Sequence, residues 1–94
     1  MDKIAMSVNE AMELVSGMLE GGDAYLDWGA VDDCNTNVSC KYIADEVGRA
    51  FKDRGYFVYN QLMGFGSKRI HQGTPVCIRI CKEPREQSST LVEF

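Results

Sequence analysis

The chain has 94 residues, 45% hydrophobic and 26% charged, which is ordinary for one globular domain and argues against disorder. Its net charge of −4 argues against nonspecific coating of nucleic acid, because such binding needs a surplus of Lys and Arg to displace counterions. A membrane span needs about 20 apolar residues, and no apolar run in this chain comes close to that length. The chain also starts without the basic and apolar regions of a signal peptide. We therefore expect a cytoplasmic protein without membrane contact.

The first helix is expected over residues 8–20. Ser7 and Glu10 have the spacing of a capping box, in which each side chain accepts a hydrogen bond from the other residue's backbone amide. Gly21 and Gly22 supply the end of the helix, because glycine adopts the left-handed conformation easily. Apolar residues recur along the segment at intervals of three and four, as in an amphipathic helix: Val8, Ala11, Met12, Val15, Met18 and Leu19.

Residues 24–30 fit either a short helix or an edge strand, because the segment is too short for periodicity to decide. A second helix is expected over residues 38–54, with an apolar stripe that includes Val47 and Phe51. Gly48 weakens the interior of this helix by about 1 kcal/mol relative to alanine, which indicates close packing at that point.

Aromatic and β-branched residues at 56–59 predict a strand over residues 56–63 with both faces covered. A glycine-rich loop follows at 64–73, and alternating side chains predict a second strand at 75–82. Residues 87–94 form a C-terminal tail that either adds a short edge strand or stays disordered.

These elements predict a single α+β domain over residues 1–86, with two main helices packed on a small antiparallel sheet that contains a β-hairpin. Its expected core residues are Val15, Met18, Leu19, Ile43, Val47, Phe51, Phe57, Val58, Val76, Ile78 and Ile80.

The four cysteines have spacings C-x5-C and C-x3-C, which differ from the two tight hooks of a usual zinc site. Without a signal peptide, reduced thiols are the expected state. Cys77 and Cys81 would lie about 13 Å apart along a regular strand, too far to bond to each other. No catalytic motif surrounds any cysteine or the single histidine, His71. We therefore expect no metal, no cofactor and no catalytic residue.

Charge divides the chain in two. Residues 1–34 carry eight acids and one base, a balance of −7, whereas residues 35–94 carry nine Lys/Arg and six acids, a balance of +3. An acidic surface suits docking on a basic protein partner, and a tryptophan among aspartates is typical of an interface anchor, although a core tryptophan is the alternative. We expect a small non-enzymatic binding protein, of the class of phage or mobile-element inhibitors. The expected partner-binding residues are Glu13, Asp23, Asp27, Trp28, Asp32 and Asp33.

The alternative function is a regulator that binds nucleic acid through the helix at 38–54 and the basic loop at 64–73. The order of elements resembles a winged helix in outline, if residues 24–31 form the second of three helices and the loop forms the wing. No motif supports this resemblance, and the loop also fits a solvated hairpin turn. The residues expected to contact nucleic acid are Lys41, Arg49, Phe65, Lys68 and Arg69.

Overall fold

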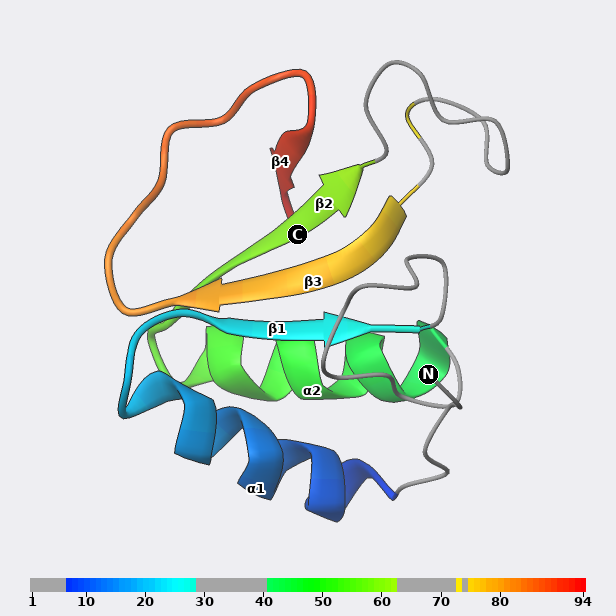
Figure 1. The fold of residues 1–94 in the computed structure, drawn as a ribbon, viewed down its shortest axis with the longest axis vertical. Helices are drawn as coiled ribbons and strands as arrows, with labels where there is room; N and C mark the ends of the chain where they lie inside the picture. Colours follow the sequence, from blue (N-terminus) through cyan, green and yellow to red (C-terminus); the bar gives the residue numbers. More distant parts are fainter. Residues whose placement is uncertain (1–6, 29–40, 63–72, 74) are drawn as a thin grey trace.

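The computed structural model describes residues 7–28, 41–62, 73 and 75–94. In chain order the elements are α1 (Val8–Leu19), β1 (Ala24–Asp27), α2 (Lys41–Asp53), β2 (Phe57–Leu62), β3 (Pro75–Cys81) and β4 (Leu91–Glu93). The strands form one antiparallel sheet in the order β1-β3-β2-β4. Both helices lie against one face of this sheet, and we call the opposite face the outer face (Figure 1). The predicted α+β fold is confirmed.

The helix ends follow the local signals in the sequence. The Ser7 hydroxyl accepts from the Glu10 amide, and the Glu10 carboxylate accepts from the Ser7 amide, each at 3.1 Å, which confirms the predicted capping box. After α2 the chain turns into β2 through Gly55, whose φ of 94° favours glycine over any residue with a Cβ atom. Residues 38–40, which the second helix was expected to include, lie outside the described residues.

The hydrophobic core lies between the helices and the sheet. Phe51 is 2% exposed, and its ring meets the ring of Tyr56 edge to face at 5.4 Å between centroids. The prediction is confirmed for Val15, Leu19, Val47, Phe51, Val58, Ile78 and Ile80, while Ile43 and Met18 are partly buried and pack against this core.

The prediction that both faces of the first hairpin strand are covered is wrong at Phe57, which is 40% exposed. Successive side chains of a strand point to opposite faces. Val58, which pairs with Ile80, faces the helices, so Phe57 faces outward opposite Cys81. Phe57 is the first residue of β2 and is exposed, whereas Tyr59, two residues later on the same face, is buried.

Residues 24–27 form a strand, which resolves the open alternative. In β1, Leu26 pairs with Ile78 of β3, and both side chains are fully buried in the core. The winged-helix order therefore fails at these residues, because it requires a helix there. At the other edge of the sheet, β4 pairs antiparallel with β2, so the tail supplies the short edge strand that was one of its two alternatives.

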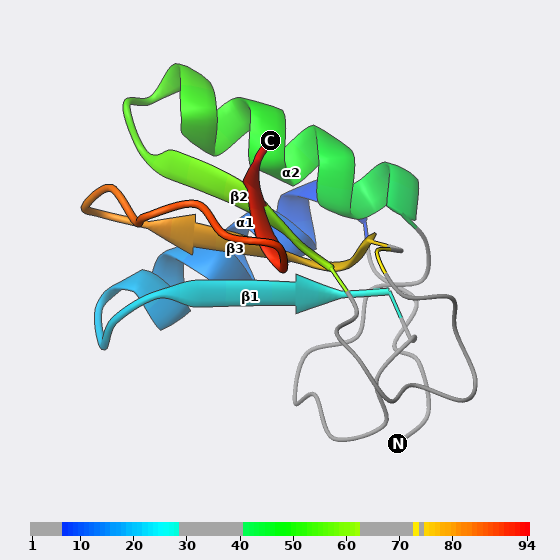
Figure 2. The same cartoon turned by 90° about the horizontal axis from the view of Figure 1, so that it is seen from above.

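Residues 82–90, which we call the crossing segment, pass over the outer face between β3 and β4 (Figure 2). The Arg85 amide donates to the Tyr59 hydroxyl at 2.8 Å, and the Leu62 amide donates to the Thr90 carbonyl at 2.8 Å. Beside this segment lies a second small hydrophobic cluster, formed by Tyr59, Cys81 and Leu91. The outer face is thus partly covered on the β2 side, while Tyr25 on β1 is 36% exposed.

Candidate functional site

The outward surface of α1 is acidic. Glu10, Glu13 and Glu20, which we call the acidic helix surface, are all exposed, and residues 7–28 contain no Lys or Arg. The pKa of Glu10 is lowered because the backbone and hydroxyl hydrogen bonds of Ser7 favour its charged form. Among the described ion pairs, none involves Glu13 or Glu20. These two carboxylates are therefore available to a partner.

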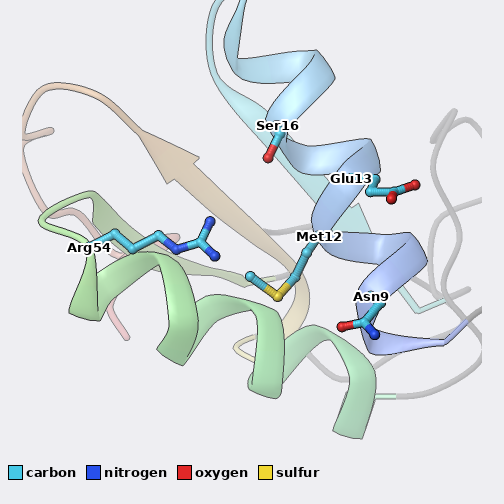
Figure 3. Close-up of a pocket in the computed structure, with 5 residues that line it drawn as sticks. All are labelled: Asn9, Met12, Glu13, Ser16 and Arg54. Atoms are coloured by element: carbon cyan, nitrogen blue, oxygen red, sulfur yellow. The ribbon is translucent and has the colours of Figure 1, made fainter.

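A groove of about 540 Å³ runs between α1 and the end of α2. Met12 and Arg54 extend toward each other across it (Figure 3), so its middle combines an apolar thioether with a cation. The Arg54 guanidinium also lies 5.0 Å from the centre of the Phe51 ring. The residues that line the groove are Asn9, Met12, Glu13, Ser16 and Arg54.

Asp23 and Asp27 do not belong to this acidic surface, contrary to expectation. The side chain of Asp23 is 13% exposed and is held by two arginines of the same chain, Arg79 and Arg85. Asp27 is fully buried in β1, where it pairs with Cys77 of β3 in the sheet register. A docking residue must reach solvent, so the burial of Asp27 and the pairing of Asp23 do not support the expectation that these two residues dock on a partner.

Trp28 is half-buried and packs against the main core, so the structure favours the core alternative over an exposed anchor. The Lys41 ammonium lies 5.9 Å from the centre of its ring, at the outer limit of a cation–π contact. Asp32 and Asp33, the remaining expected docking residues, lie outside the described residues.

The two α2 cations expected to contact nucleic acid are paired with carboxylates on the same helix. Lys41 lies 2.9 Å from Asp45, and Arg49 lies 2.8 Å from Glu46. The sequence of α2 balances three basic residues against three acidic ones, so this helix provides no net positive charge for phosphates. Phe65, Lys68 and Arg69 of the basic loop lie outside the described residues.

A charged cluster that sequence reasoning missed lies on the outer face. Arg79 donates to Asp23 Oδ2 from Nε at 3.1 Å and from Nη2 at 2.9 Å. Arg85 Nη2 donates to Oδ1 at 3.0 Å and to Oδ2 at 3.1 Å. Arg79 of β3 pairs with Tyr25 of β1 on one side and with Tyr59 of β2 on the other. Its guanidinium lies 5.3 Å from the centre of the Tyr25 ring.

Two opposed effects set the ionisation of this cluster. Burial raises the pKa of Asp23, but hydrogen bonds from Arg85, Arg79 and Cys81 outweigh burial and leave that pKa below its usual value. Burial raises the pKa of the Cys81 thiol, and the charge of Asp23 raises it further. At neutral pH the cluster therefore holds one carboxylate, two guanidinium groups and a protonated thiol.

Within the described part of the chain, no group of three His, Cys, Asp or Glu side chains is placed to hold a metal ion. Among the same residues, no helix is long and apolar enough to span a membrane. The chain matches no family model, and comparisons with curated proteins and with solved structures gave no match.

Proposed function

We propose that this chain is a small non-enzymatic binding protein that docks on a basic protein partner through the acidic helix surface and the adjoining groove. The observation that carries the proposal is the exposed Glu13, which lies beside a groove with Met12 in its middle, on a helix without any base. A partner segment complements this surface if its basic side chains meet Glu13 and Glu20 and its apolar side chain meets Met12, because the Arg54 guanidinium in the same groove repels a base.

The two parts of the surface contribute in different ways. Exposed carboxylates raise the rate of encounter with a basic partner and favour one orientation. Salt weakens this attraction, because the screening length between charges is about 8 Å at physiological ionic strength. Met12 adapts to the shape of an inserted side chain, because its thioether chain is flexible and polarisable. Affinity would thus come from apolar contact in the groove, and orientation from the charges around it.

The groove offers little for catalysis, which supports a binding role. Ser16 is the residue with a hydroxyl among the five that line it, and these five include no histidine or cysteine that would activate a nucleophile. The partner class that fits best is a protein whose basic surface also binds nucleic acid. The acidic helix would compete with the nucleic acid for that surface, as an inhibitor does.

Affinity capture with matched charge reversals tests the proposal. The variant Glu13→Lys/Glu20→Lys should lose the captured partner, while Glu86→Lys, a reversal on the crossing segment away from α1, should keep it. Capture should survive nuclease treatment, and added nucleic acid should release the partner. Capture that the double reversal leaves intact would overturn the proposal. Capture that nuclease removes would instead favour nucleic-acid binding.

A further inference from the structure

The outer face carries a second site that is separate from the acidic helix surface. We propose that the paired guanidinium groups of Arg79 and Arg85 bind a phosphate group, either free inorganic phosphate or the phosphate of a nucleotide. The pair lies on the opposite side of the sheet from α1, so this inference does not depend on the proposed docking function.

The two guanidinium groups converge on one point. Their Nη2 atoms are at most 6.0 Å apart, because their distances to Asp23 Oδ2 are 2.9 Å for Arg79 and 3.1 Å for Arg85. Two positive charges face one carboxylate there, so the cluster keeps a net charge of +1. The side chains of Arg79 and Arg85 are 26% and 41% exposed, so solvent and a ligand reach both.

Donor groups remain for a ligand. The hydrogen bonds to Asp23 use Nε and Nη2 of Arg79 and only Nη2 of Arg85, and no hydrogen bond among the described residues uses Nη1 of either arginine. A phosphate group presents several acceptor oxygens and about −1.5 to −2 charges at neutral pH. Planar guanidinium forks match such oxygens in pairs, which is why arginine is preferred at phosphate sites.

The neighbouring aromatic ring gives the site its shape. The Arg79 guanidinium lies over the Tyr25 ring, 5.3 Å from its centre, within the range of a cation–π contact. Tyr25 is 36% exposed as a residue, so its side chain offers a surface on which the base of a nucleotide would stack. Stacking distinguishes the two sources of phosphate, because inorganic phosphate gains nothing from Tyr25.

A purely structural role is the competing explanation, since Arg85 also fastens the crossing segment to Asp23 and to the hydroxyl of Tyr59. The two explanations differ in what Asp23→Asn does. If the arginines serve a ligand, the carboxylate competes with it, and the variant should bind phosphate about tenfold more tightly. If they serve only the fold, the variant should gain no phosphate binding, and its loss of stability is expected under both explanations.

The experiment is an NMR titration of the full chain with inorganic phosphate and, separately, with adenosine monophosphate, at constant ionic strength. We expect saturable shifts of the Arg79 and Arg85 Nε–H signals. Arg85→Gln should weaken binding at least tenfold. Lys82→Gln removes the same charge from a residue that borders a different hollow, beside Arg54 and Tyr56, and should change affinity less than threefold.

Absence of saturable shifts, or equal binding by the wild type and Arg85→Gln, would overturn the proposal. If Asp23→Asn does not fold, the comparison of Arg85→Gln with Lys82→Gln decides alone, because both residues are exposed. Tighter binding of the nucleotide, with the advantage lost in Tyr25→Leu, would identify a nucleotide as the source. Equal binding of both probes would show that the site recognises the phosphate group alone and that Tyr25 adds no stacking.

Discussion

The packing of Gly48 on α2 gives a quantitative test of how the helix meets the sheet. In an open helix, replacing glycine by alanine stabilises by about 0.8–1.0 kcal/mol. A Cβ atom at Gly48 would lie 3.2 Å from Phe94 Cζ and 3.4 Å from Ile78 Cδ1. Carbon atoms in favourable contact are about 3.5–4.0 Å apart, so the Phe94 ring or the helix must shift. Overpacking of this kind costs about 1–3 kcal/mol.

Gly17 on α1 is the matched control, because a Cβ atom there meets nothing within 4 Å. We expect Gly17→Ala to raise the free energy of unfolding by about 1 kcal/mol. The same change at Gly48 should lower it by up to about 2 kcal/mol, since the cost of overpacking offsets the helix propensity.

Urea unfolding gives the free energy of unfolding of both variants. The values are compared directly if the m-value, the slope with urea concentration, is the same for both. The double variant Gly48→Ala/Phe94→Leu removes the closest contact and should recover at least about 1 kcal/mol relative to the sum of its single changes. If Gly48→Ala stabilises the protein as much as Gly17→Ala does, the contact of α2 with Phe94 is wrong.

Three further predictions concern the core, the charged cluster and the thiols. Phe51→Ala should destabilise by about 3–5 kcal/mol because the ring is buried in the core; an unchanged melting temperature would refute this placement. The pKa of Asp23 is lowered on folding, so its stabilising effect is fully present above about pH 4 and is lost as the pH falls through the lower folded value. The stability advantage of wild type over Asp23→Asn, followed by urea unfolding, should therefore shrink below about pH 4, and a constant difference down to pH 2 would count against it. In a variant with Cys34 and Cys40 replaced by serine, the buried Cys77 and Cys81 should react with an aqueous thiol reagent only after unfolding. Rapid modification of the native protein would show that they are accessible.

The sequence predicts those elements that have strong local signals. The capping box and the three-to-four spacing place α1 within one residue of its observed end, because both signals come from contacts inside the helix. For β1, four residues give too short a pattern. The strand is decided by its pairing with residues of β3 that are 50 to 56 positions away in the chain. The exposure of Phe57 was missed for a similar reason. A run of aromatic residues predicts a strand, but it does not show which residues of that strand another part of the chain will cover.

The candidate site was only partly predictable for a related reason. Charge counting found Glu13, since an exposed helix position follows from periodicity alone. It counted Asp23 and Asp27 as part of the same surface because it contains no information on tertiary contacts. The pairing of Asp23 with Arg79 and Arg85 spans 56 and 62 residues, and only the sheet register brings these groups together.

The most direct test of the docking proposal is the affinity of the captured partner, measured by titration calorimetry at several salt concentrations. We expect Glu13→Lys/Glu20→Lys to weaken binding at least about tenfold, or about 1.4 kcal/mol, at low salt, while Glu86→Lys stays close to wild type. The difference between wild type and the double reversal should shrink as salt rises, because exposed charges are screened. Equal affinity of the wild type and the double reversal at low salt would contradict docking through α1.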